Sequence, residues 1–218
     1  GVATADVHVS LARLFGTEAA TPQARDDQAA SWRRRLQLAI AEVPQLAEAR
    51  GAIAAVYARA AEGSWPSFQR IHGDYHLGQV ILVPERGWVL LDFEGEPIRP
   101  MDERVRPDLA IRDVAGMLRS FDYIAGSIRL EDPSRAGDAV GAGDSDGSAD
   151  AVDAWARAAR QSFLDGYAAT SGVDLTEHGA LLDALELDKA VYEALYEVRN
   201  RPDWITIPLH AIDRLLPH

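Results

Sequence analysis

The sequence predicts an α+β fold that is mostly α-helical, with one small β-hairpin carrying a loop rich in polar side chains. Apolar residues recur at helical spacing through most of the 218 residues. Short β-branched runs appear only between residues 64 and 95, where the helical spacing is lost. With 47% hydrophobic residues, the chain is long enough for one core or for one large lobe with a smaller helical subdomain.

The first unit, residues 1–63, is predicted to be a helical intermediate subdomain. A first helix has apolar residues at i, i+4, i+7 and i+8, which places them on one face: Val7, Leu11, Leu14 and Phe15. Residues 17–28 are expected to form a loop. Two further helices are predicted over 32–43 and 46–60, separated at Pro44, because proline interrupts a helix.

The second unit, residues 64–218, is predicted to form the core that carries the chemistry. The runs QVILVP and WVLLDFEG are short strands joined by a turn at ERG, and FQRIHGD before them is a further strand. The proline-rich segment 96–108 is expected to be an extended loop, followed by a mostly buried helix over 109–126. Two long helices and a short one after Pro208 complete the chain.

Residues 131–150 consist almost entirely of Gly, Ala, Ser and Asp, with almost nothing to bury. Such a composition predicts a disordered loop, to which we assign no chemistry.

The charge and composition exclude several classes of protein. A formal charge of -12 repels nucleic acid and anionic lipid alike, so neither is an expected partner. The absence of cysteine removes disulfides, thiolate metal sites and cysteine nucleophiles from consideration. No stretch approaches the roughly 20 apolar residues of a membrane span, and the first residues lack the order of a secretory signal. We therefore expect a cytoplasmic protein.

The chemically informative segment is HGDYHLGQ, residues 72–79, followed by DFEGEP, residues 92–97. Phosphoryl transfer needs a carboxylate that accepts the proton of the attacking hydroxyl, and oxygen ligands that hold Mg²⁺ against the phosphates. In protein kinases a catalytic aspartate is followed five positions later by a metal-binding amide, and a hairpin then leads to a second aspartate. Asp74, Gln79 and Asp92 have that order and spacing, with Gln in place of Asn.

These segments, together with RPDLAIRDVAGMLRSFDY and EALYEVRNRPDW, resemble actinobacterial maltokinases over nearly the whole chain. That family has the aminoglycoside-phosphotransferase-like version of the kinase fold, and related bacterial glucosamine kinases have a similar layout. The resemblance implies the C-terminal catalytic lobe of an enzyme that converts maltose and ATP to maltose 1-phosphate and ADP. The segment DFEGEP favours maltose, and glucosamine or another amino sugar is the alternative acceptor.

The resemblance also implies a role for individual residues. Asp74 would be the catalytic base, and Gln79 and Asp92 the Mg²⁺ ligands. Five residues are candidates for binding the sugar: His76, Glu94, Glu96, Glu193 and Trp204. Carboxylates pair with sugar hydroxyls and an indole supports the C–H face of the ring, which suits such a site. His72 and Asp113 are predicted to support the loop.

Part of the kinase pattern is missing from this sequence. It has no G-x-G-x-x-G loop, strand lysine or paired helix glutamate, which belong to the N-terminal lobe that covers the ATP phosphates. Glu94 stands where protein kinases have the glycine of their DFG motif, so their activation-loop switch is not carried over. The N-lobe is therefore predicted to be absent from this chain, and the isolated chain to be nearly inactive.

Structural alternatives remain for each candidate. An aspartate after a strand is commonly a helix cap or turn former, His72 and His76 could suggest a zinc pair, and Trp204 could be an ordinary core aromatic. Glu193 could be a solvated helix residue. A rival of another class is a non-catalytic sugar-binding or scaffold lobe that docks onto a glucan-pathway enzyme such as trehalose synthase.

Overall fold

The computed structural model describes residues 1–95, 106–131 and 148–216. Long helices dominate it, as predicted. In chain order they are α1 (Val2–Phe15), α2 (Pro22–Glu42), α3 (Leu46–Glu62), α5 (Ala110–Glu131), α6 (Ser148–Ser171), α7 (Gly179–Asn200) and α8 (Thr206–Leu215).

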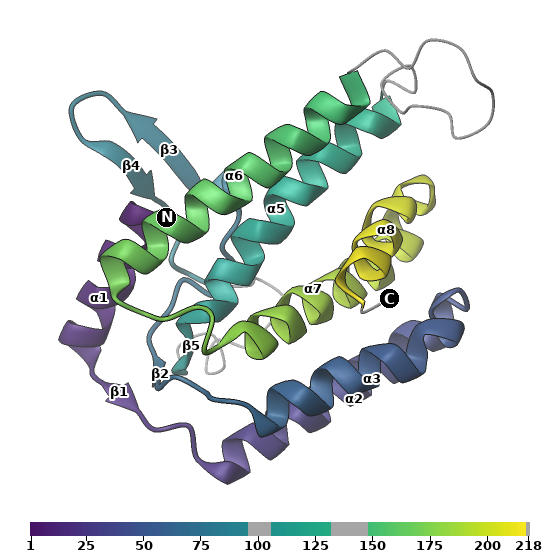
Figure 1. Ribbon diagram of the computed structural model, residues 1–218, viewed down its shortest axis with the longest axis horizontal. Coiled ribbons are helices and arrows are strands. Elements are labelled where there is room, and N and C mark those ends of the chain that lie inside the picture. Colours follow the sequence, from purple (N-terminus) through teal and green to yellow (C-terminus); the bar gives the residue numbers. More distant parts are fainter. Residues whose placement is uncertain (96–105, 132–147, 217–218) are drawn as a thin grey trace.

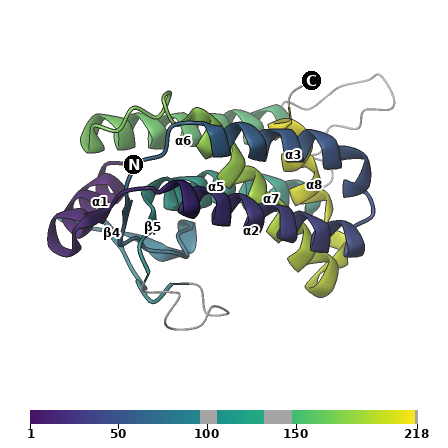
Figure 2. The same ribbon diagram turned by 90° about the horizontal axis from the view of Figure 1, so that it is seen from below.

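The helix α7 lies at the centre of the helical layer and contacts most of the others. It packs against α5, against α8 and against the antiparallel pair formed by α2 and α3. The helix α6 lies along α5 on the other side, and α1 packs against α6 (Figures 1 and 2). Seen from below, α6 and α3 run along one layer of the molecule and α2 lies beneath them (Figure 2).

Two small antiparallel sheets lie beside this helical layer. One has the order β1-β2-β5 and consists of two-residue strands, β1 (Thr17–Glu18), β2 (Phe68–Gln69) and β5 (Asp108–Leu109). The other is the predicted hairpin of β3 (Val80–Val83) and β4 (Gly87–Leu90), with Val80 opposite Leu90. The strand predicted at FQRIHGD is therefore shorter than expected and pairs in a different sheet from the hairpin.

One hydrophobic core runs through both predicted units. Trp32 of α2 is fully buried and stacks on Tyr57 of α3, with ring centroids 5.3 Å apart. Trp65 lies 6.0 Å from Trp32 and donates its indole N–H to the carbonyl of Ala60. The same core cluster contains buried side chains of α5 and α7. Residues on both sides of position 63 contribute to this continuous core. The predicted division into two units at that position stays a prediction.

The prediction for residues 17–28 was wrong, because α2 begins at Pro22 inside the expected loop. The reason is local: Thr21 has extended backbone angles and its hydroxyl accepts the N–H of Ala24 at 3.2 Å. Proline then fills the first helical position, where its missing N–H costs nothing. The N-cap and the proline favour a helix start here, although the polar composition of the segment suggested a loop.

The first helix forms as predicted, but only part of its predicted apolar face packs against the core, where Val7 is partly buried. Leu14 and Phe15 are 74% and 70% exposed. The buried residues of α1 are Thr4, Ala5 and His8. The face that packs into the protein is therefore partly polar, which apolar spacing alone does not reveal.

The loop predicted at residues 131–150 is shorter at both ends. Glu131 is the last residue of α5, and α6 already begins at Ser148. The rest of the predicted loop, residues 132–147, lies outside the described residues. The last helix, α8, begins at Thr206, two residues before Pro208, so the proline lies within its first turn.

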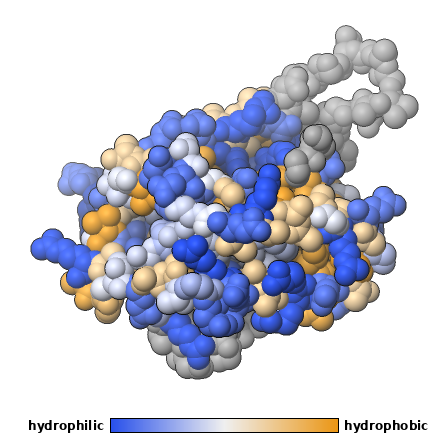
Figure 3. Space-filling view, turned by 60° about the horizontal axis from the view of Figure 1, so that its bottom comes forward, coloured by the Kyte–Doolittle hydropathy of each residue, from blue (hydrophilic) through white to orange (hydrophobic). Residues whose placement is uncertain are grey.

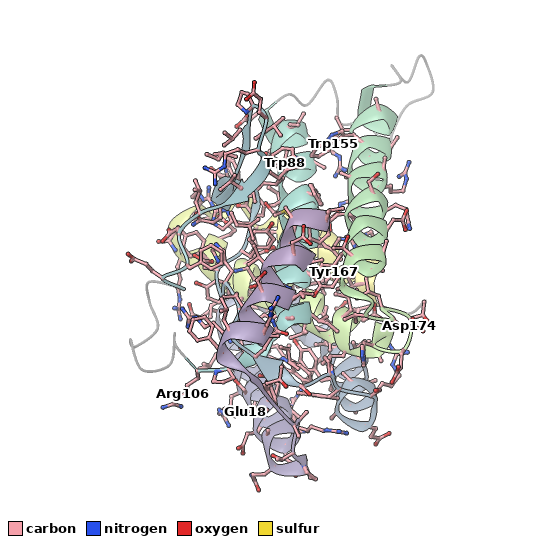
Figure 4. All side chains as sticks on the ribbon, turned by 90° about the vertical axis from the view of Figure 1, so that its left-hand side faces the viewer. Glu18, Trp88, Arg106, Trp155, Tyr167 and Asp174 are labelled. Carbon is pink, nitrogen blue, oxygen red and sulfur yellow. The ribbon has the colours of Figure 1, made fainter. Side chains whose placement is uncertain are left out.

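The surface is mostly hydrophilic, with scattered apolar groups on the face shown in Figure 3. The hairpin also exposes two large apolar side chains, Leu82 at 63% and Trp88 at 57%; Trp88 is labelled in Figure 4. Within the described parts of the chain, no helix combines the length and apolar character needed to cross a membrane.

Candidate active site

The segment between β2 and β3 forms a tight loop, residues 72–79, called here the Asp74 loop. Gly73 has φ of +89°, a left-handed conformation that glycine adopts without steric cost. The loop ends in a short 3₁₀ helix, Leu77–Gln79, whose first turn is capped by His76: its Nδ1 accepts the N–H of Gly78 at 3.0 Å. Asp74 is half-buried within the loop.

The hairpin brings Gln79 and Asp92 together although they are thirteen positions apart. Pairing of Val80 with Leu90 sets the register, and the N–H of Leu91 donates to the carbonyl of Gln79 at 2.9 Å. The side-chain amide of Gln79 then donates to Oδ2 of Asp92 at 3.2 Å. Asp92 has φ of +59°, which aspartate tolerates better than most residues, and is exposed.

His72 connects the two halves of this arrangement. Its Nδ1 accepts the backbone N–H of Asp74 at 3.3 Å, and its Nε2 lies 2.7 Å from the carbonyl of Leu91. Because a carbonyl only accepts, these partners assign the proton to Nε2. The ring is buried and lies 4.9 Å from that of Phe93. His72 therefore ties the backbone of Asp74 to the residue that precedes Asp92, as a supporting residue would.

His76 lies within electrostatic reach of both Asp74 and Asp92. Burial lowers the pKa of His76, as do the positive charge of Lys189 and the neighbouring His72, while Asp74 and Asp92 both act to raise it. Both carboxylates are thus close enough to the imidazole to affect its proton affinity. Two carboxylates and an amide meet at one end of the hairpin, on the same side of the molecule.

Asp113 of α5 holds the Asp74 loop from behind. Its carboxylate is buried and accepts the backbone N–H groups of His72 and Gly73 at 2.8 and 3.0 Å. Burial acts to raise the pKa of Asp113, but hydrogen bonds from His8 and from these two amides outweigh burial, and the pKa is lowered. Asp113 is therefore a buried, ionised acceptor, and its predicted role in supporting the loop stays a prediction.

The helix α5 also touches the loop directly. A Cβ on Gly116 would lie 2.5 Å from the carbonyl oxygen of Tyr75, so only glycine permits this approach. One turn later, the hydroxyl of Ser120 accepts the N–H of Leu77 at 3.0 Å. The loop thus rests on α5 through backbone contacts on both sides of Asp74.

A polar cavity of about 60 Å³ opens beside Asp74, between the loop, α2, α5 and α7. Arg35 reaches it from α2 and forms an ion pair with Asp188 of α7. Lys189 and Tyr192, also of α7, line the same cavity, with the ammonium 5.3 Å from the ring centroid. Sequence reasoning missed these residues, because nothing in their spacing relates them to the Asp74 loop.

The predicted sugar-binding residues are dispersed. Glu193 accepts from the buried guanidinium of Arg119 at 2.6 Å. Trp204 stacks on Tyr123 with centroids 6.0 Å apart, and the guanidinium of Arg201 lies 4.6 Å from its ring. Among the described residues, no hydrogen bond or ion pair joins Glu193 or Trp204 to the Asp74 loop. Their sugar role stays a prediction.

Of the other three candidates, His76 lies on the Asp74 loop, and two are the glutamates that follow Asp92. Glu94 is exposed near the end of the hairpin, and Glu96 lies outside the described residues.

The donor set at the hairpin suits Mg²⁺ better than zinc. Within the described ranges, no group of three or more His, Asp or Glu side chains is placed to hold a metal ion. Mg²⁺ does not need one, because it is commonly held by one or two protein oxygens together with substrate phosphates and water. The carboxylate of Asp92 and the amide oxygen of Gln79 fit that requirement. His72 and His76 are both engaged with backbone groups of the loop.

A helical lobe with a short hairpin that gathers a half-buried aspartate, an amide and a second aspartate is the layout of kinase-fold phosphotransferases. The chain belongs to the APH phosphotransferase enzyme family, whose family model matches residues 1–181. The predicted fold class and kinase family are thereby confirmed.

Two glucosamine kinases are similar to this chain in sequence. The chain is 32% identical to a glucosamine kinase of Streptacidiphilus jiangxiensis in an alignment of 229 positions, which covers 100% of this chain and 48% of that protein. A glucosamine kinase of Mycolicibacterium smegmatis is 32% identical over 150 residues, or 66% of this chain and 34% of the relative.

Solved structures agree with this assignment. A glucosamine kinase in complex with glucosamine, ADP and inorganic phosphate matches with a TM-score of 0.81 and 30% identity, over 98% of this chain and 50% of the other. Crystal form A of glucosamine kinase matches with a TM-score of 0.82 and 31% identity, over 99% of this chain and 49% of the other. The chain spans about half the length of the proteins in these structures. The finer prediction, a maltokinase, is not shown by these matches.

Proposed function

We propose that this chain supplies the acceptor and metal half of an ATP-dependent sugar kinase. The proposal is supported by the hydrogen bond between Gln79 and Asp92 at the end of the hairpin, by the link through His72 from Leu91 to the backbone of Asp74, and by the cavity that Asp74 borders. A phosphotransferase needs such a corner to hold an acceptor hydroxyl next to a nucleotide phosphate. A non-catalytic binding lobe would have no need for this spacing.

Asp74 is the general base in this proposal. Its carboxylate accepts the proton of an acceptor hydroxyl as that oxygen attacks the γ-phosphorus of ATP. The bond between the γ-phosphorus and the β,γ-bridging oxygen breaks, and ADP leaves with the electron pair. The backbone of Asp74 is fixed through His72 and the loop through Asp113, so the carboxylate is held in position before the acceptor binds.

Gln79 and Asp92 would hold Mg²⁺ through their side-chain oxygens. The bound ion would neutralise charge that spreads over the transferred phosphoryl group. Gln79 and Asp92 already share a hydrogen bond, which limits the rotamers of both side chains.

The cavity beside Asp74 is the proposed position of the acceptor. Lys189 can donate N–H groups to sugar hydroxyl oxygens, and Tyr192 offers an aromatic face. The ion pair of Arg35 and Asp188 adds charged groups to the same cavity. The proposed acceptor class is a small sugar. Glucosamine or another amino sugar has the stronger support, because the relatives in sequence and in structure are glucosamine kinases.

Maltose is the second candidate acceptor, supported by the segment DFEGEP and by the resemblance to maltokinases. Trehalose synthase as a docking partner rests on that resemblance alone.

The test uses the full-length protein with Asp74→Asn. Because the amide cannot accept the hydroxyl proton, we expect the kcat for sugar phosphorylation to fall by about 10³-fold, with thermal stability unchanged. The matched control is Asp26→Asn, which removes the charge of an exposed aspartate of α2 and should keep full activity. Unchanged activity of the Asp74 variant would overturn the catalytic role.

The acceptor is identified with the same protein by measuring ADP release with glucosamine and with maltose. Phosphorylation of glucosamine with little turnover of maltose is the expected result. The opposite preference would favour the maltokinase prediction. Failure of both sugars to react would contradict the proposed acceptor class.

A further inference from the structure

The buried face of α1 carries two polar side chains one turn apart, and both contact the support of the Asp74 loop. Thr4 and His8 are 1% and 3% exposed. Their spacing of four residues places them on the same side of the helix. This polar pair is buried more deeply than the apolar residues that the sequence grouped on one face of α1.

His8 is connected to Asp113 by a hydrogen bond whose direction can be assigned. Its Nε2 lies 3.0 Å from Oδ2 of Asp113, and its Nδ1 lies 2.9 Å from the hydroxyl of Tyr167 on α6. The lowered pKa of Asp113 keeps its carboxylate ionised, so it only accepts, and Nε2 must carry the proton. Burial raises the pKa of Tyr167, so the phenol stays protonated, and its oxygen lies within hydrogen-bonding distance of Nδ1.

The hydrogen bonds form one chain from α6 to the Asp74 loop. Tyr167 is hydrogen-bonded to His8, His8 donates to Asp113, and Asp113 accepts the amide N–H groups of His72 and Gly73. Tyr167 lies between α6 and α1 in Figure 4. Without His8, one oxygen of a fully buried carboxylate would lose a donor, and the carboxylate could rotate away from the loop amides.

Thr4 supports the other side of the loop. Its hydroxyl lies 2.7 Å from that of Tyr75, the residue after Asp74. Burial raises the pKa of Tyr75 to about 12, so the phenol keeps its proton and the contact persists at neutral pH. The backbone of α1 is also fixed here, because the amide of Gln69 donates to the carbonyl of His8 at 2.9 Å.

We propose that Thr4 and His8 are positioning residues for catalysis, which set the place of the Asp74 carboxylate by clamping the loop from α1. His8 acts through Asp113, and Thr4 acts through Tyr75. Neither touches the cavity beside Asp74, so neither is expected to contact a substrate. The kinetic part of this inference rests on the proposed kinase function; the structural part does not.

The kinetic test compares His8→Leu, His8→Gln and Thr4→Val in the full-length protein at a temperature where each is folded. We expect His8→Leu to lower kcat by about 10- to 100-fold with the KM values for ATP and sugar nearly unchanged, since a misplaced base slows chemistry more than binding. His8→Gln keeps an N–H donor that can reach Asp113, and should recover most of the loss. Thr4→Val should lower kcat by a few-fold.

Val9→Ala changes an exposed position of the same helix and is the matched control, with kcat expected to be unchanged. A kcat for His8→Leu within twofold of the unmodified protein would overturn the proposal. So would a Gln variant that is as slow as the Leu variant. If His8→Leu does not fold, Thr4→Val decides the question: a kcat lowered by a few-fold supports the proposal, and a kcat equal to that of the unmodified protein overturns it.

A second measurement needs no substrate, so it separates failure of this inference from failure of the proposed function. Amide hydrogen exchange at His72 and Gly73 should become at least tenfold faster in His8→Leu, because their common acceptor loses its support. Exchange in α2 and α3 should not change. Equal protection of the two loop amides in both proteins would refute the clamp, whatever the enzyme phosphorylates.

Discussion

The Asp74 loop has two sides that differ in exposure and in the origin of their residues. On the hairpin side, Gln79 and Asp92 come from one stretch of sequence, and Asp92 is exposed. On the helix side, Asp113 and His8 are nearly fully buried and come from α5 and α1. The first side carries the proposed chemistry, and the second holds the loop in place. The side chains of the first are joined by one hydrogen bond to each other, whereas those of the second form a buried network that we expect to serve stability and function together.

The largest effect that would sharpen this comparison is expected for Asp92→Asn. Loss of the negative charge removes the stronger of the two proposed metal ligands, so we expect kcat to fall by about 10³-fold. The melting temperature should hardly move, because the side chain is exposed and its one assigned contact is with Gln79. Steady-state kinetics over a range of Mg²⁺ concentrations, together with thermal unfolding, check both statements. A large loss of stability would break the contrast between the two sides.

Asp113→Asn tests the other side and should affect both properties. The carboxylate of Asp113 accepts N–H groups from His8, His72 and Gly73. In an asparagine, the NH₂ group would face at least one of these donors and leave it unpaired. We therefore expect the free energy of unfolding to fall by about 3 kcal/mol. Denaturant titration measures this loss, and kcat should fall as well.

The pH dependence gives an independent control for this variant. The folded-state pKa of Asp113 is lowered, so the stability it contributes is present above the ordinary aspartate pKa of about 4 and is lost as the pH falls toward the folded-state value. The difference between the variant and the unmodified protein should therefore be constant near neutral pH and shrink below about pH 4. A difference that grows on acidification would contradict the ionised state of Asp113.

The smallest effect is expected for Gly116→Ala. The new Cβ would lie 2.5 Å from the carbonyl oxygen of Tyr75, so α5 and the loop must separate by a few tenths of an ångström or more. We expect kcat to fall by about tenfold. Gly51→Ala in α3 is the matched control: nothing lies within 4 Å of its Cβ, and helix propensity predicts stabilisation by about 0.5–1 kcal/mol. Full activity of the Gly116 variant would show that the contact does not position the loop.

The hairpin side could be predicted from sequence because its signals are local. Asp74, Gln79 and Asp92 are related by a short turn and one hairpin, and hairpin register fixes which residues meet. The start of α2 was missed although its signal is also local: Thr21 followed by proline outweighed a polar composition that suggested a loop. The functional roles of these residues stay predictions until the variants are measured.

The helix side and the cavity could not be predicted in the same way. His8 reaches Asp113 across 105 positions, and Lys189 reaches the cavity at Asp74 from the far end of the chain. Nothing in the neighbourhood of either residue marks it as different from other polar residues on a helix. The exposed Leu14 and Phe15 mislead in the opposite direction, because their helical spacing suggests a buried face that the fold does not use.

The sequence by itself determined the helical character of this protein, the hairpin, and the grouping of an aspartate, an amide and a second aspartate, since each depends on periodicity or on a few neighbouring residues. Only the tertiary structure decided which face of α1 is buried, what holds the loop, and which charged groups surround Asp74. These depend on how helices pack, and packing joins side chains that no local spacing relates.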